Sequence, residues 1–152
     1  MTLGERLHHG FEGPAWHGNA TLELLKGLTA DVATARPHPS VHTIAELVAH
    51  MISWRRFAIQ MLERNFEYRI QIDSTIDWPD VSTLSQSEWE VLIQELVHSQ
   101  RRILKLLSSW TTEELNAPAG DRPFSVAVIV HGVADHDIYH GGQIALTLKM
   151  KK

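Results

Sequence analysis

The residues with the clearest chemical potential lie near the C-terminus, where His136 and His140 are four positions apart. They belong to the segment His-Asp-Ile-Tyr-His-Gly-Gly-Gln-Ile, residues 136–144. On an α-helix a four-residue offset rotates the second side chain by only about 40°, so both imidazoles lie on one face. Gln143 lies about 20° to the other side of His136. This polar stripe on an otherwise apolar helix predicts a metal site.

Two histidines do not complete such a site, because zinc and related ions usually take three protein ligands and keep a position for water or substrate. His50 is the best candidate for the third ligand. It interrupts an apolar stripe that also contains Leu47, Trp54, Phe57 and Met61. The alternative is a hydrogen-bonded core histidine, the commoner role in such a stripe. We expect one divalent metal ion per chain, for which zinc, nickel, copper, iron and manganese are candidates.

Four further side chains are candidates for a catalytic role beside the metal: Gln143, Tyr139, His17 and Glu46. Glycines near His17 indicate a close backbone approach, which would allow His17 to line the site. Glu46 lies one turn before His50 and is a candidate base, although a helix-capping role already explains it. Tyr139 is either a packing residue or a hydroxyl that reaches a bound ligand. These patterns leave the general base open.

Three other polar residues of the helix that carries His136 are expected to point away from the metal. His131 lies about 140° around the helix from His136. Asp135 and Asp137 project about 100° to either side of His136. Each aspartate either orients an imidazole on an adjacent helix or is solvated.

The composition sets the broad class of the protein. With 152 residues, 43% of them apolar and 21% charged, residues 1–152 are expected to form one globular domain. The net charge of −4 disfavours nucleic-acid binding, which needs clustered basic residues. The absence of cysteine excludes disulfide, zinc-thiolate and cysteine-nucleophile chemistry. Without a signal-peptide core or a membrane-spanning apolar run, a cytoplasmic location and no membrane association are expected.

Four amphipathic helices are predicted to position the candidate ligands, in an all-α antiparallel bundle. The predicted helices cover residues 14–28, 44–64, 86–110 and 126–149. Capping boxes begin the second and third helices at Thr43 and Ser85, and Ser125 is a candidate N-cap for the fourth. Some connections exceed the length usual in bundles, so a simple up-and-down order is not required. The predicted core contains Leu47, Trp54, Phe57, Leu96, Ile103, Ile129 and Val133.

The residues around His50, Glu-Leu-Val-Ala-His-Met-Ile-Ser-Trp, together with residues 136–144, resemble the DinB/YfiT-like superfamily. The resemblance extends over nearly the whole chain. It implies a four-helix bundle with one crossover connection and a divalent metal, zinc or nickel, at His50, His136 and His140. It also implies homodimers. The glycine pair at 141 and 142 would suit either a partner subunit or a crossing helix. Some members of this superfamily are similar to hydrolases, and others transfer low-molecular-weight thiols such as mycothiol or bacillithiol.

Two hypotheses about function follow. The first is a metal-dependent enzyme, a hydrolase or thiol S-transferase, whose three histidines hold a metal that activates water or a thiolate for a small-molecule substrate. The second is a non-catalytic stress-response or binding module in which the metal holds two helices together. A closed set of protein ligands would favour the second hypothesis, whereas an open position beside a pocket would favour the first.

Overall fold

The computed structural model describes residues 1–150, and every regular element in this range is an α-helix. The helices are α1 Leu3–Phe11, α2 Thr21–Leu25, α3 Ala30–Thr34, α4 Ile44–Leu62, α5 Gln86–Leu107, α6 Thr112–Asn116 and α7 Val126–Met150. The predicted all-α class is therefore confirmed. None of the described helices combines the length and apolar character needed to cross a membrane.

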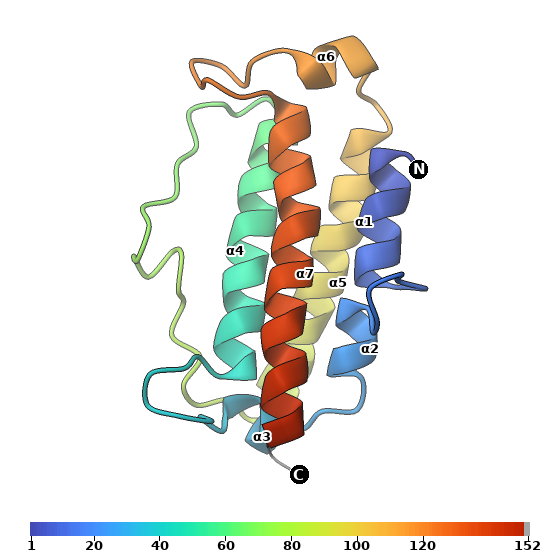
Figure 1. Ribbon diagram of the computed structural model, residues 1–152. Helices are drawn as coiled ribbons and strands as arrows, with labels where there is room; N and C mark the ends of the chain where they lie inside the picture. Colours follow the sequence, from blue (N-terminus) through green and yellow to red (C-terminus); the bar gives the residue numbers. More distant parts are fainter. Residues whose placement is uncertain (151–152) are drawn as a thin grey trace.

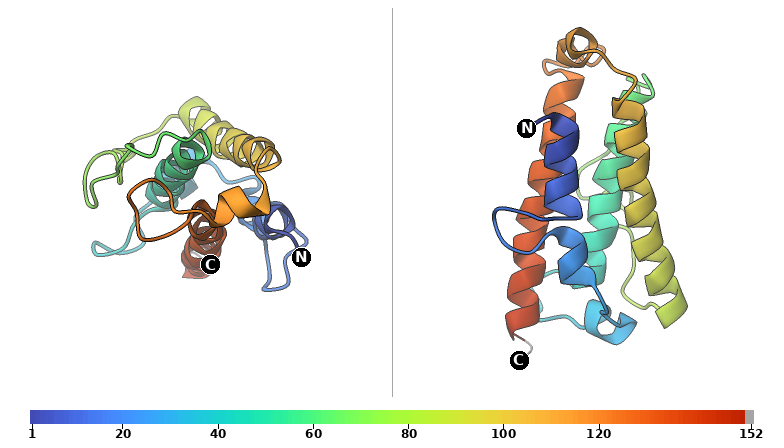
Figure 2. Two further views of the ribbon diagram at one scale, coloured as in Figure 1. Left: turned by 90° about the horizontal axis from the view of Figure 1, so that it is seen from above. Right: turned by 90° about the vertical axis from the view of Figure 1, so that its right-hand side faces the viewer.

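The long helices α4, α5 and α7 pack around a shared core, with α1 and α2 in succession at the fourth corner (Figures 1 and 2). Helices α4 and α5 run in the same direction, opposite to α1 and α7 (Figure 1). Residues 63–85 make this possible by crossing back along the outer side of α4 (Figure 1). This crossover connection is important for the site described below.

The starts of the long helices agree with the sequence because their caps are local. Thr43 and Glu46 form a capping box at α4, in which the Glu46 amide donates to Thr43 Oγ1 over 3.1 Å. Ser85 and Glu88 form the same arrangement at α5. The amide of Val128 donates to Ser125 Oγ over 3.4 Å at the start of α7. Each cap satisfies amides that have no partner within the helix.

The predicted helix over residues 14–28 is wrong. Gly13 and Gly18 have φ values of 93° and 129°, which an α-helix excludes, and only Thr21–Leu25 form a helix, α2. Helix α1, Leu3–Phe11, takes the bundle corner instead, beginning with a capping box between Thr2 and Glu5. The two short helices α3 and α6 also lie in segments predicted to be irregular.

The core consists of two apolar clusters with buried polar residues between them. One cluster contains Ile52 and Ile144, and the other contains Ala58 and Ala134. His50, Arg55, Asp137 and His140 are buried near the junction. The predicted core residues Leu47, Leu96, Ile103, Ile129 and Val133 are buried. Trp54 and Phe57 are half-buried, because they form the wall of a cavity.

Candidate metal centre

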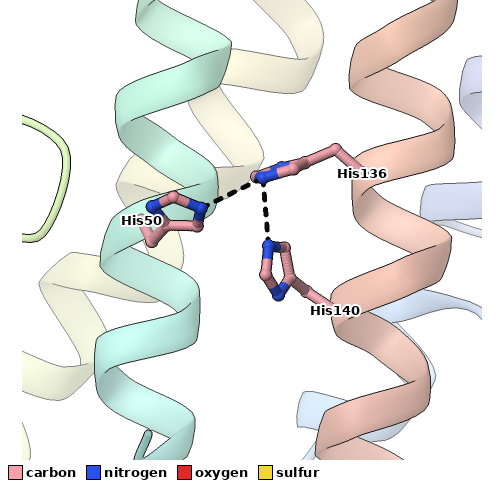
Figure 3. Close-up of side chains that lie close together, drawn as sticks. All are labelled: His50, His136 and His140. Carbon is pink, nitrogen blue, oxygen red and sulfur yellow. Dashed lines mark hydrogen bonds between the residues drawn. The ribbon is translucent and has the colours of Figure 1, made fainter. Parts of the chain in front are cut away.

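Three histidine side chains meet between α4 and α7 (Figure 3). His136 Nε2 lies 3.1 Å from His50 Nε2 and 3.0 Å from His140 Nε2. Nitrogen ligands of a tetrahedral zinc ion lie about 3.3 Å apart, given zinc–nitrogen distances of about 2.0–2.1 Å. The three nitrogens therefore have a separation suited to one small cation. This is the trio that the four-residue spacing and the histidine in the α4 stripe predict.

The second ring nitrogen of His50 is held by the crossover connection. His50 Nδ1 lies 3.0 Å from both the main-chain oxygen and the Oδ1 atom of Asp77. Asp77 is buried, and its carboxylate accepts hydrogen bonds from Trp54 Nε1 and the Asp73 amide, each over 2.9 Å. Because both oxygens facing His50 accept hydrogen bonds, Nδ1 carries the proton and Nε2 presents a lone pair to the cluster.

The same reasoning applies to His140. Its Nδ1 lies 2.6 Å from Oε1 of Gln143, so Nδ1 donates and Nε2 presents a lone pair. A proton on His136 Nε2 can satisfy only one of the two lone pairs that face it. A cation at the centre would satisfy all three nitrogens. The donor set therefore fits a metal better than a network of hydrogen bonds.

All three imidazoles are biased toward the neutral form that binds metal. Burial, reinforced by the neighbouring His140 and His50, lowers the pKa of His136 from 6.5 to about 3. Burial also lowers the pKa of His50, against the opposing effect of Asp77. Burial lowers the pKa of His140, with Gln143 opposing. Neutral rings leave their lone pairs available to a ligand at neutral pH.

An aromatic stack encloses His50 on the side of the crossover. The Trp78 ring lies 3.8 Å from the His50 ring and 3.8 Å from the His42 ring, with interplanar angles of 6° and 8°. Trp78 and Asp77 both lie in the connection between the second and third predicted helices, for which the sequence predicts no functional role. Asp77 and Trp78 thus hold the His50 ring by a hydrogen bond and by stacking. An aspartate followed by tryptophan in a long connection is the only sequence signal that points to them.

Comparison with known proteins identifies the family. A family model of the DinB superfamily matches residues 15–144, which include all three histidines. The chain belongs to the DinB superfamily. A crystal structure of a conserved protein from Enterococcus faecalis is similar, with a TM-score of 0.72 and 19% identity over 97% of this chain and 94% of that chain. This likeness supports the fold. No curated protein matches the sequence.

The other candidate residues of this DinB protein occupy different places. Gln143 contacts His140 through the nitrogen that faces away from the cluster, so it orients the ring. Tyr139 is 64% exposed, and its ring centroid lies 5.0 Å from that of His140. Glu46 accepts from the Thr43 amide over 2.8 Å and pairs with Arg36, as the capping interpretation predicts.

His17 is not part of the cluster. It is exposed in the turn before α2 and lines a separate cavity of about 610 Å³ together with Gly141 and Gly142 of α7. A Cβ atom at Gly141 would lie 3.6 Å from Leu24 Cδ1, so this glycine admits α2 of the same chain. The expected homodimer therefore gains no support from Gly141.

The two aspartates that flank His136 do not orient an imidazole. Asp135 is exposed and pairs with Arg6. Asp137 is buried and forms a two-pronged ion pair with Arg55, in which Arg55 Nε donates to Oδ1 over 3.3 Å and Nη2 donates to Oδ2. His131 is exposed, in agreement with the prediction that it points away from the site.

Proposed function

We propose that this DinB protein is a divalent-metal-dependent enzyme in which His50, His136 and His140 hold the metal. The observation that carries the proposal is the convergence of three Nε2 atoms with two lone pairs that no proton can satisfy together. A divalent ion bound there supplies a nucleophile at neutral pH by lowering the pKa of a coordinated water or thiol. Zinc or nickel suits three imidazole ligands.

The number of protein ligands favours catalysis over a purely structural metal. Among the described residues, the group of ligand atoms within 4.8 Å of one another comes from three histidines. Structural zinc sites usually use four protein ligands, whereas catalytic sites use three and keep one position open. A cavity of about 240 Å³ borders His136, so a small molecule has room to approach. This favours the enzyme over the non-catalytic module.

The surrounding residues act on the ligands in distinct ways. Asp77 and Trp78 fix the tautomer and plane of His50, and Gln143 fixes the tautomer of His140. Tyr139 is exposed and its ring lies beside that of His140, so its hydroxyl is a candidate for contact with a substrate. The chemistry we propose is hydrolysis or transfer of a low-molecular-weight thiol to an electrophile, because both reactions need the same metal ligands.

Elemental analysis of purified variants tests the metal site. Wild type should hold one divalent ion per chain, and His50→Ala, His136→Ala or His140→Ala should each abolish binding, because two imidazoles compete poorly with water. His131→Ala is the matched control, since His131 lies on the same helix and is exposed. Full metal occupancy in His50→Ala, or equal loss in His131→Ala, would contradict the proposed ligand set.

Product analysis distinguishes the two reactions. The metal-loaded protein is incubated with an electrophile or an activated ester, with and without a low-molecular-weight thiol. A thiol transferase forms a conjugate only when the thiol is present and gives no product with water alone. A hydrolase hydrolyses the ester without thiol. Inactivity toward both classes in protein with full metal content would favour the structural module. Homodimerisation remains a proposal from the family resemblance, to be measured by sedimentation.

A further inference from the structure

The cavity beside His136 has walls of a distinct kind. It opens between α4 and α7 with a volume of about 240 Å³. Its walls include Trp54, Phe57, Ile129, Gly132, Val133 and His136. Within the described part of the chain, His136 is the one ionisable side chain in this wall. One of the metal-site histidines is therefore also the polar end of an otherwise apolar cavity.

These walls offer few hydrogen bonds to a ligand. The indole N–H of Trp54 already donates to Asp77 Oδ1 over 2.9 Å. A charged or heavily hydroxylated group would lose its hydration in the cavity without gaining a partner, which is unfavourable. A hydrocarbon group would gain free energy in proportion to the apolar surface it buries.

Gly132 helps to keep this cavity open. It lies in the second turn of α7, inside the helix, where glycine is destabilising relative to alanine. A Cβ atom at this position would meet no other atom within 4 Å, so helix packing does not require a glycine. A side chain at Gly132 would instead line the cavity and reduce its volume.

We infer that the substrate of this site carries an uncharged apolar group, of the size of one substituted aromatic ring, that enters the cavity while its polar group faces the three histidines. The inference rests on the proposed function and specifies its substrate class as small aryl or branched-alkyl compounds. An apolar cavity of about 150 Å³ holds benzene. A cavity of about 240 Å³ accommodates a ring with a short substituent.

Two metal-binding probes that differ only in their apolar group test the inference. Acetohydroxamate and benzohydroxamate chelate a divalent ion through the same oxygens, and their affinities for the metal-loaded protein are measured by calorimetry. Benzohydroxamate should bind at least about tenfold more tightly, because its ring is buried in the cavity. Gly132→Leu should remove that advantage and leave acetohydroxamate binding unchanged.

Gly142→Leu is the matched control. Gly142 lies on the same helix, a Cβ atom there also meets nothing within 4 Å, and it borders the cavity that contains His17. This variant should keep the preference for benzohydroxamate. Equal affinities of the two probes for metal-loaded wild type, or an unchanged preference in Gly132→Leu, would overturn the inference alone. Protein that holds no metal and binds neither probe would overturn the proposed metal centre and this inference with it.

Discussion

Polar side chains between α4 and α7 form a layer with two parts, and the hydrogen-bonding groups of the two parts are satisfied in different ways. In one part Arg55 and Asp137 neutralise each other, and Arg55 Nη1 also donates to Gln100 Oε1 over 2.9 Å. Gln100 Nε2 in turn donates to the Leu7 carbonyl over 3.1 Å. In the other part three neutral histidines turn nitrogen atoms toward one another. The first part is satisfied by the protein alone, whereas the second presents two lone pairs that one cation could satisfy together.

This difference teaches how a buried network is distinguished from a site. The two parts share the helices α4 and α7, and Asp137 directly follows His136. A network whose donors and acceptors match stabilises the packing of the helices. A cluster with two lone pairs and at most one proton between its three facing nitrogens is organised for an external ligand. Both parts place polar side chains between the same two helices, so the balance of donors and acceptors is the informative feature.

Breaking the ion pair should have the largest effect on stability. Arg55→Met leaves Asp137 buried without its partner, which should cost about 3–5 kcal/mol in the free energy of unfolding, measured with urea. Metal content per folded chain should not change. The double variant Arg55→Met with Asp137→Leu should recover most of the loss, because no charge is then buried. A double variant as unstable as Arg55→Met would show that the pair has a role beyond mutual neutralisation.

Asp77→Asn should weaken metal binding by the three histidines without affecting the ion pair between Arg55 and Asp137. It removes the negative charge beside His50 Nδ1, and loss of such a partner typically weakens metal binding by about 10–100-fold. The dissociation constant is measured by competition with a chelator. Asp80→Asn is the control, because Asp80 lies in the same connection and is exposed, with its carboxylate bonded to the Ser82 amide. An unchanged metal affinity in Asp77→Asn would show that Asp77 does not contribute to metal binding.

Acid should destabilise the metal-free protein through the histidine part. The pKa of His136 is about 3 in the folded state, below the ordinary 6.5, so the unfolded chain binds a proton first as the pH falls. The contribution of His136 to stability is therefore present above pH 6.5 and declines toward pH 3. Between pH 7 and pH 5 the loss should be about 2 kcal/mol. Urea unfolding of His136→Gln should lack this component; an identical pH dependence in both proteins would contradict the assignment.

Substitution of Glu46 should have the smallest effect on the free energy of unfolding. Glu46→Ala removes a capping interaction at α4 and should cost about 1 kcal/mol of stability. Glu88→Ala removes the equivalent interaction at α5 and serves as the control. Both variants should retain the metal content of wild type. They should also retain its activity, measured with the substrate that the product analysis identifies. Loss of activity in Glu46→Ala alone would restore Glu46 as a candidate base.

The sequence by itself determined the features that depend on neighbours within one or two helical turns. The spacing of His136 and His140 places both rings on one face, because an α-helix repeats every 3.6 residues. The capping boxes locate the starts of α4 and α5 for the same local reason. The position of His50 in an apolar stripe of α4 was enough to select it as the third member. The helix prediction over residues 14–28 failed because Gly18 adopts a positive φ value, which a glycine permits but does not require.

Only the tertiary structure decided which distant side chains complete these local patterns. Asp77 is 27 residues from His50 and reaches it because the crossover connection runs back along α4. Asp137 is 82 residues from Arg55, and their pairing depends on α4 and α7 lying side by side. A glycine at 141 would allow close approach of either a partner subunit or a helix of its own chain, and in the structure it is α2 of the same chain that lies against it. Helical periodicity is a property of the local backbone, whereas these contacts depend on the path of the whole chain.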